Sequence, residues 1–214
     1  MATKEPTGMA LAAAEREDLA DFLARLTPEQ WRAPSLCAGW SVRDVVAHVI
    51  SYDEIGWRGL PWRLLRGRLG GGDANAVGLR DYAQHSPEDL LALLRTHLTP
   101  RGLPAAFGGM IGLTDALIHH QDIRRPLGLP RTVPPERLAA ALPRALAAPV
   151  LPAKQNAAGL RLVVTDLDLV HGDGPEVRGP GEALLLAVAG REAALTDLDG
   201  PGLATLTTRV SQGH

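Results

Sequence analysis

Residues 41–50 read SVRDVVAHVI, and this stretch sets the architecture of the N-terminal part of the chain. Its apolar side chains recur at intervals of three and four residues, as on one face of a helix: Val42, Val45, Val46, Val49 and Ile50. Ser41 is a good N-cap, and Asp44 three residues later completes a capping-box-like start. His48 follows Val45 by three positions, so we expect its imidazole close to the buried stripe.

A second stretch, LTDALIHHQDI at residues 113–123, carries the other candidate ligands. Asp115 and His119 are four residues apart, which puts them on one helical face about 6 Å apart at Cβ. His48 from another helix would complete a facial set of ligands with open positions. Imidazole nitrogen and carboxylate oxygen suit zinc, with nickel, iron and manganese as alternatives. The competing interpretation is that each histidine is only a satisfied core or surface residue.

Four neighbours of this pair are weaker candidates. His120 lies about 100° round the helix and is expected to lean towards a neighbouring helix or a second layer of the site. Asp122 either holds an imidazole N–H or is only a charge on the last helical turn. Arg124 and Arg125 either complement the helix dipole or bind an anionic substrate or cofactor at the mouth of the bundle.

The remaining patterns predict a mostly helical chain. Apolar periodicity and capping signals indicate further helices at about 8–26, 86–98, 107–125 and 134–149, the last one kinked or split by Pro143. The stretch 61–79 is expected to be a loop or a broken helix, with a mobile glycine run at Gly70–Gly72. We therefore predict an up-and-down four-helix bundle in a domain spanning residues 1–152.

From Leu160 onward the pattern changes to a small α+β domain, predicted for residues 153–214. Apolar residues at spacing two suggest strands around 162–169, and HGDG at 171–174 suggests a hairpin turn. GEALLLAVAGR, from Gly181, is expected to be a short helix, and TLTTRV at 205–210 a last strand. Asp166, Asp168 and Asp173 fit hairpin chemistry better than a metal loop.

Composition excludes several classes of protein. The net charge of -2 over 214 residues gives no basic excess for binding nucleic acid. The single cysteine, Cys37, rules out an intramolecular disulfide and is expected to be a small buried hydrophobe. The longest apolar stretch near the N-terminus, Met9–Ala14, is too short for a signal or a membrane span. We expect a cytoplasmic protein with neither nucleic acid nor membrane as a partner.

The two helical motifs, SLCAGWSVRDVVAHVI and LTDALIHHQDIRRPLG, resemble the DinB-like, mycothiol-dependent maleylpyruvate isomerase family. Residues 162–191 also look like the small, sterol-carrier-like C-terminal domain of that family. The resemblance implies an actinobacterial type of protein with His48, Asp115 and His119 as metal ligands. One difference is that the better-studied isomerase members have Glu where this chain has Asp115, whose carboxylate reaches less far from its helix.

The resemblance implies a metal, in first place zinc, that activates the small-molecule thiol mycothiol for attack on an electrophile. The function expected is therefore that of a thiol-dependent isomerase or S-transferase acting on a small electrophilic substrate. The alternative is a non-catalytic module that binds a small ligand or has a regulatory role, with a degenerate metal site. A third hypothesis is a purely structural helical protein, and a homodimer is compatible with each of them.

Overall fold

The computed structural model describes residues 6–70 and 73–212, which form two compact units divided between Pro130 and Arg131. Of the glycine run expected to be mobile, Gly70–Gly72, the last two residues lie outside the described part of the chain. The two compact units divide after Pro130, whereas the sequence analysis places the domain boundary after residue 152. Which of these segments fold independently stays a prediction. Within the described part of the chain, no helix has the length and hydropathy needed to cross a bilayer.

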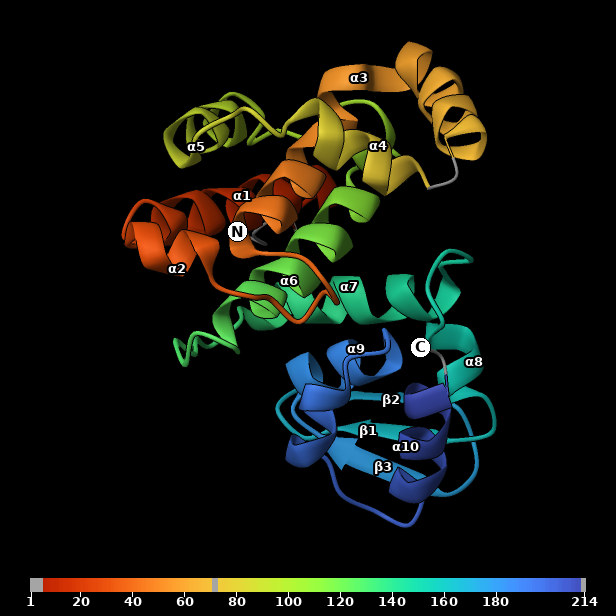
Figure 1. Ribbon diagram of the computed structural model, residues 1–214. Coiled ribbons are helices and arrows are strands. Elements are labelled where there is room, and N and C mark those ends of the chain that lie inside the picture. The colour runs from red at the N-terminus through yellow and green to blue at the C-terminus, as the bar shows by residue number, and fades with distance from the viewer. Residues whose placement is uncertain (1–5, 71–72, 213–214) are drawn as a thin grey trace, which may run out of the picture. The chain divides into compact units, whose positions relative to one another are not determined.

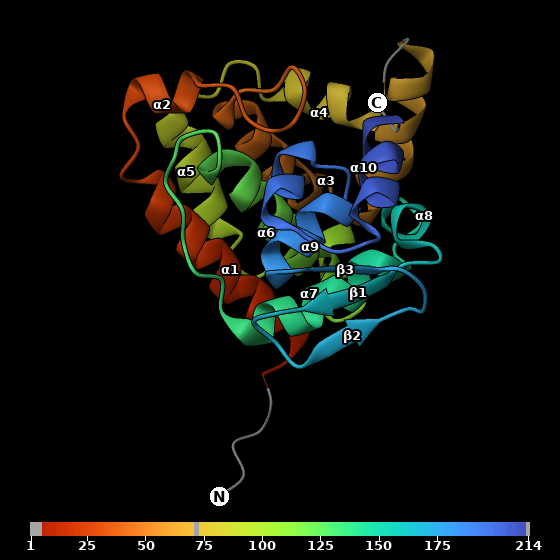
Figure 2. The same cartoon turned by 90° about the horizontal axis from the view of Figure 1, so that it is seen from below.

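The first unit is the predicted four-helix bundle (Figures 1 and 2). Its main helices are α1 (Gly8–Leu23), α3 (Val42–Leu69), α5 (Pro87–Thr96) and α6 (Met110–Arg124). Helices α1 and α3 each pack against both α5 and α6, which closes the bundle around one core. Shorter elements connect these helices: α2 (Pro28–Arg32), α4 (Ala74–Asp81) and the 3-10 helix η1 (Leu103–Ala105).

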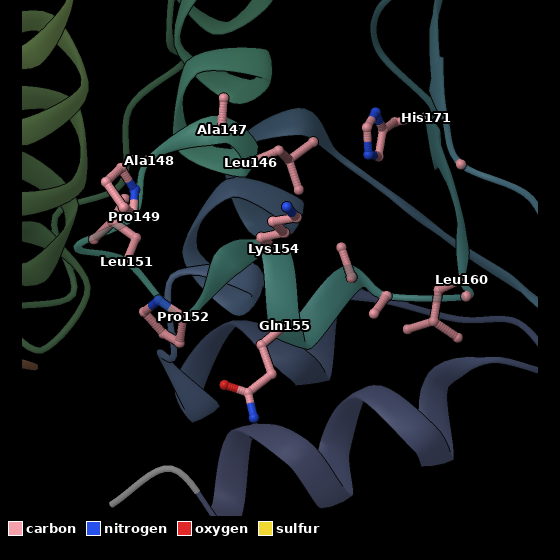
Figure 3. A pocket seen from close by; sticks show the side chains of 14 residues that line it. Leu146, Ala147, Ala148, Pro149, Leu151, Pro152, Lys154, Gln155, Leu160 and His171 are labelled. Atoms are coloured by element: carbon pink, nitrogen blue, oxygen red, sulfur yellow. The ribbon is translucent and has the colours of Figure 1, made fainter.

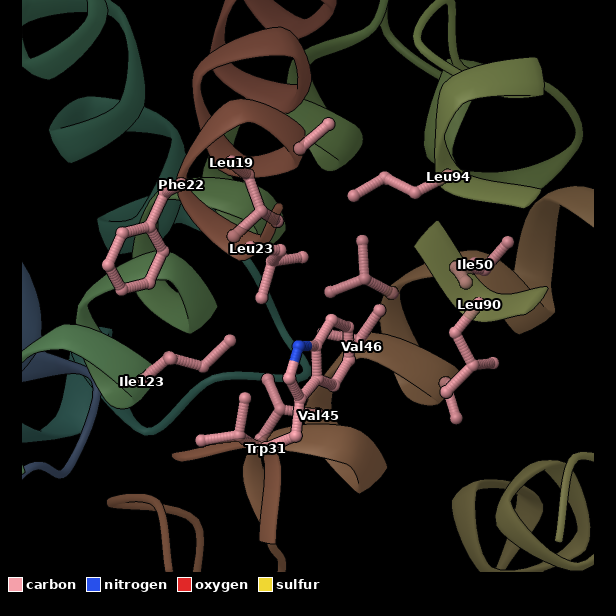
Figure 4. Packing of buried hydrophobic residues seen from close by; sticks show 14 of the residues in the cluster. Leu19, Phe22, Leu23, Trp31, Val45, Val46, Ile50, Leu90, Leu94 and Ile123 are labelled. Carbon is pink, nitrogen blue, oxygen red and sulfur yellow. The ribbon is translucent and has the colours of Figure 1, made fainter. Parts of the chain in front are cut away.

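The bundle core is built from the apolar stripes that the sequence pattern predicts (Figure 4). The stripe of α3 is at most 2% exposed along its length: Val42, Val45, Val46, Val49 and Ile50. It meets Leu19, Phe22 and Leu23 of α1, and Leu90 and Leu94 of α5. Each fully buried side chain of this size contributes about 1.5–3 kcal/mol, so the stripe holds α3 firmly in one rotation about its axis.

The predicted capping box at the start of α3 is present, and a second one starts α5. Ser41 accepts a hydrogen bond from the Asp44 N–H at 3.3 Å, and the Asp44 carboxylate accepts one from the Ser41 N–H at 3.0 Å. Ser86 and Asp89 form the same reciprocal pair at the start of α5, with Pro87 in the first helical turn. These caps fix where α3 and α5 begin and therefore which residues face the core.

Helix α3 changes direction at Gly56, which has φ 54° and ψ -166°. A positive φ costs glycine little, so the helix breaks there and restarts. The stretch 61–79, expected to be a loop or a broken helix, is helical up to Leu69 and again in α4. Pro61 removes only one backbone hydrogen bond, near the start of the distal segment, and this explains why the helix continues past it.

A buried ion pair ties three parts of the bundle together. Both terminal nitrogens of Arg16 in α1 contact the Asp53 carboxylate of α3 at 2.9 Å, and both side chains are fully buried. Arg16 also donates to the His97 carbonyl, and Asp53 accepts from the Arg101 N–H. Removing one partner of such a pair costs about 3–5 kcal/mol, because the other charge stays buried.

The second unit is the small α+β part that the sequence predicts (Figure 1). Its elements are α7 (Pro135–Ala147), α8 (Ala153–Ala157), β1 (Arg161–Val164), β2 (Leu169–His171), β3 (Glu176–Gly179), α9 (Gly181–Val188), the 3-10 helix η2 (Glu192–Asp197) and α10 (Leu203–Gln212). The sheet has the order β2-β1-β3. Strand β1 pairs antiparallel with β2 and parallel with β3.

Two local predictions in this unit are wrong. The HGDG turn does not form a hairpin, because it carries the chain from β2 to β3, on the opposite side of β1. The hairpin turn lies before β2, at residues 165–168. The stretch TLTTRV is helical and belongs to α10, which buries Leu206 and Val210 at helical spacing. Helix α9 forms as predicted, and α7 is one helix with Pro143 inside it.

The second unit also contains a pocket between the end of α7, α8 and the start of β1 (Figure 3). Its lining is mostly apolar, with Lys154 and His171 as its titratable side chains. All of its lining residues belong to this unit, whereas the predicted ligands His48, Asp115 and His119 belong to the first.

Candidate metal centre

Helices α3 and α6 bring His48, Asp115 and His119 together in the bundle. The Asp115 Oδ1 atom lies 3.4 Å from His48 Nε2 and 3.5 Å from His119 Nε2. One ligand atom from each residue lies within 4.8 Å of the other two. The two imidazole rings stand nearly perpendicular, with centroids 4.8 Å apart. The arrangement follows from the sequence, because Asp115 and His119 are one helical turn apart and His48 borders the buried stripe of α3.

The spacing of these atoms fits a divalent cation. Zinc bonds to imidazole nitrogen and carboxylate oxygen are about 2.0–2.2 Å, so two ligand atoms of a tetrahedral site are about 3.3–3.5 Å apart. The two distances from Asp115 Oδ1 match that edge. The carboxylate is 28% exposed, whereas each imidazole is 11% exposed, so solvent or a small ligand can reach the group from the Asp115 side.

Charge within the group favours an ionised carboxylate. Burial alone would raise the pKa of Asp115, but His119 and His48 together hold it well below its ordinary value. Burial would lower the pKa of His119, yet Asp115 above all, with help from Asp122 and Cys37, raises it well above 6.5. Burial lowers the pKa of His48, which favours a neutral imidazole with a lone pair for a cation.

The other face of His119 meets Asp122 and Cys37. The Asp122 Oδ2 atom lies 2.9 Å from His119 Nδ1, and the Cys37 thiol donates to the same oxygen at 3.1 Å. The Cys37 sulfur is 3.6 Å from His119 Nδ1. A carboxylate at Nδ1 keeps the proton on that nitrogen and directs the Nε2 lone pair towards the ligand group, as in many metal sites.

The loop before α3 is fixed in a way that places Cys37 at this position. The Leu36 N–H donates to the Asp122 carbonyl at 3.0 Å, which attaches the loop to α6. The Ser35 hydroxyl accepts from the Cys37 N–H and donates to the Trp40 carbonyl, so the turn is closed on itself. Cys37 is only partly buried. The sequence analysis expected a small buried apolar residue and did not predict its contact with His119. It also belongs to a second group of potential ligand atoms, with His119 and Asp122.

Aromatic rings and a buried arginine surround His48. The Trp40 and Tyr52 rings have centroids 5.1 Å and 5.7 Å from the His48 ring. The Arg63 guanidinium stacks on Tyr52 at 4.1 Å and donates to Ser51 Oγ, which in turn donates to the His48 carbonyl. The His48 Nδ1 atom is buried, and within residues 6–70 and 73–212 it has no hydrogen-bond partner. Ring packing therefore orients His48, whereas a hydrogen bond orients His119.

Of the four weaker candidates on α6, Asp122 contacts His119, whereas His120, Arg124 and Arg125 are engaged elsewhere. The ring nitrogens of His120 face Glu15 of α1 at 2.8 Å and the Arg124 Nε atom at 2.8 Å. His120 thus leans towards a neighbouring helix, one of the two expectations. The Arg124 guanidinium also stacks on Phe22 at 3.8 Å and donates to the Leu129 carbonyl. Arg125 is the C-cap of α6. A role of these residues towards a ligand stays a prediction.

The chain is similar to one protein family and to two solved structures. Residues 12–101 match the family described as the mycothiol maleylpyruvate isomerase N-terminal domain. Two solved structures share the fold: the mycothiol-dependent maleylpyruvate isomerase and a histidine-to-alanine mutant of it, each 16% identical, with a TM-score of 0.61 over 91% of both chains. No curated protein matches the chain. Residues 12–101 are therefore similar to the N-terminal domain of the mycothiol maleylpyruvate isomerase family, and the fold of the chain is that of the isomerase.

Proposed function

We propose that the chain is a metal-dependent enzyme that uses a small-molecule thiol of the mycothiol type. It would either isomerise a small electrophilic substrate or transfer the thiol to it. The observation that carries the proposal is the convergence of His48, Asp115 and His119 from two helices of a domain of this family. Two imidazoles and one carboxylate leave coordination positions open, as catalytic rather than structural sites do.

The three residues would hold a divalent cation, in first place zinc, which when bound lowers the pKa of a thiol and makes it a nucleophile. Asp115 is ionised at neutral pH and would offset part of the positive charge of the site. Asp122 would keep the His119 proton on Nδ1. The buried Arg63 guanidinium, close to Tyr52 and His48, adds positive charge that favours an anionic ligand at the centre.

One observation favours a second candidate function. The shorter side chain of Asp115, where the isomerase-type members have Glu, is compatible with a degenerate site in a module that binds a small ligand without turnover. The two candidates differ in their response to a thiol and an electrophile supplied together.

The test uses the full chain loaded with zinc and incubated with mycothiol and either of two electrophiles, maleylpyruvate or monochlorobimane. We expect a rate above that of the free thiol for at least one of them. The rate should depend on both metal and thiol, disappear in His48→Ala and persist in His171→Ala, which removes an exposed histidine of the second unit. Bound zinc without acceleration for either electrophile would favour the binding module.

A further inference from the structure

The distal part of α3, residues 57–69, concentrates apolar side chains on the surface. Of the nine exposed large hydrophobic residues in the described part of the chain, five belong to this segment: Trp57, Trp62, Leu64, Leu65 and Leu69. They are between 43% and 76% exposed. Monomeric proteins rarely expose a contiguous apolar patch of this kind without an interaction to explain it.

The exposed positions of this segment carry only a few kinds of side chain. The buried positions Arg63 and Gly67 are four residues apart and face α4. All exposed positions of the segment carry Trp, Leu, Pro or Arg, with no acidic and no neutral polar side chain: Trp57, Arg58, Pro61, Trp62, Leu64, Leu65, Arg66, Arg68 and Leu69. We call these residues the Trp–Arg face.

The charge of the segment is opposite to that of the whole chain. The segment contains four arginines and no acidic residue, whereas the chain has a net charge of -2. Arg66 pairs with Asp81 of α4 at 2.9 Å, and Arg63 is buried. Arg58 and Arg68 are exposed and add positive charge among the tryptophans. The partner that complements this face is therefore both anionic and apolar.

We propose that the Trp–Arg face binds the surface of a membrane that contains anionic phospholipid. Helical faces that carry Trp and Leu with Arg lie in the interface between a lipid bilayer and water. There the apolar side chains insert below the lipid headgroups, and the arginines contact the phosphates. A second copy of the chain fits less well. A twofold pairing of this face would place its arginines opposite one another, without an acid in the segment to neutralise them.

This proposal departs from the expectation of no membrane partner, which rested on the absence of a spanning segment. A helix that lies on a bilayer needs no such segment. Gly56 gives the distal part of α3 its own direction. The distal residue that contacts Tyr52 and Ser51 is the buried Arg63, which does not belong to the Trp–Arg face.

The test measures co-sedimentation of the full chain with vesicles of phosphatidylcholine alone and of phosphatidylcholine mixed with phosphatidylglycerol. We expect binding to the mixed vesicles, weakened by salt, and a blue shift of tryptophan fluorescence that brominated lipid quenches. Trp57→Gln with Trp62→Gln should abolish the shift. Arg58→Glu with Arg68→Glu should weaken binding by more than about 25-fold, since each arginine near such a surface contributes about fivefold.

The control variants reverse two charges, or replace an exposed apolar side chain by Gln, at sites outside the Trp–Arg face. Arg25→Glu with Arg95→Glu gives the same change of net charge at exposed sites of the first unit, and Val150→Gln removes an apolar side chain that is 88% exposed. Both controls should bind like the wild type. The proposal is overturned if neither kind of vesicle binds the chain or if the face variants bind as the wild type does. It is also overturned if the wild type self-associates in sedimentation velocity and the face variants become monomeric, because the face would then join two copies.

Discussion

His119 contacts different groups with its two ring nitrogens. Its Nε2 atom faces Asp115, and its Nδ1 atom faces Asp122 and Cys37. One residue thus joins the candidate ligand group to the loop before α3. A substitution at Asp122 should therefore alter metal affinity through its effect on the His119 imidazole.

Replacing Asp122 by Asn tests this connection. The amide keeps the volume of the fully buried side chain but removes the charge that holds the proton on His119 Nδ1. We expect metal affinity to fall about 10–100-fold, as is typical when such a partner is lost. Competition with a chromophoric chelator measures the affinity, and circular dichroism checks folding. Unchanged affinity in a folded variant would show that Asp122 does not orient His119.

The pH dependence of metal binding follows from the raised pKa of His119. The pKa lies above 6.5 in the metal-free folded protein. The charged pair with Asp115 therefore stabilises the fold below pH 6.5, and this contribution is lost as the pH rises through the raised pKa. A metal at Nε2 must displace the same proton. We expect affinity to increase about tenfold per pH unit until the pH passes the pKa of His119.

Calorimetry in buffers of different ionisation enthalpy measures the protons released on metal binding. About one proton should be released near pH 6.5, and fewer at a pH above the pKa of His119. An affinity that does not vary between about pH 6 and pH 8, without proton release, would contradict this account.

The sequence predicts the ligand group but only part of its surroundings. Asp115 and His119 could be paired because helical spacing fixes their relation, and His48 because it borders an apolar stripe. Cys37 and Arg63 gave no such signal. Their positions depend on a loop attached to α6 and on a helix that breaks at Gly56, and both are consequences of tertiary packing.

At the scale of the elements, Gly78 of α4 makes room for Arg63 of α3. A Cβ atom at position 78 would lie 1.8 Å from the Arg63 Nη2 atom and 2.6 Å from its Cζ atom. Gly78→Ala should therefore expel the guanidinium from its site and lower the free energy of unfolding by about 1–3 kcal/mol. Chemical denaturation measures the change.

A double-mutant cycle isolates the cause. In an Arg63→Ala background, the clash with the guanidinium is gone and the closest remaining atom to the new Cβ is Ser51 Oγ at 3.1 Å, so most of the cost of the substitution should disappear. If the costs of the two substitutions simply add, the clash with Arg63 is not the reason for glycine at this position.

Local propensity misled the prediction for the last element. The stretch TLTTRV is rich in β-branched residues, which favour strands. In α10, Leu206 and Val210 are buried one helical turn apart, and Thr205, Thr207 and Thr208 are exposed. Burial of an apolar helical face outweighed the small intrinsic preference. The HGDG turn was misassigned because its glycines indicate a turn without saying which strands it connects.

At the scale of the whole molecule, the candidate ligands all lie in the first unit. A ligand that binds only the folded state stabilises it by about 2.7 kcal/mol at a free concentration of 100 times Kd. For a chain of this size, that corresponds to a rise in Tm of roughly 5–10 °C.

Scanning calorimetry of the full chain should therefore show a higher Tm for the transition of the first unit with excess zinc than with a chelator. His48→Ala should show the same Tm under both conditions. A rise of equal size in His48→Ala would mean that zinc stabilises the chain through another site.

The most direct test of the central claim is the metal content of freshly purified protein by elemental mass spectrometry. The wild type, His48→Ala, His119→Ala and Asp115→Ala should be compared, with His171→Ala as the control. We predict about one divalent metal per chain in the wild type and the control, and a loss of most of it in the three ligand variants. A wild type that neither contains metal nor takes it up on titration would contradict the claim that His48, Asp115 and His119 form a metal centre.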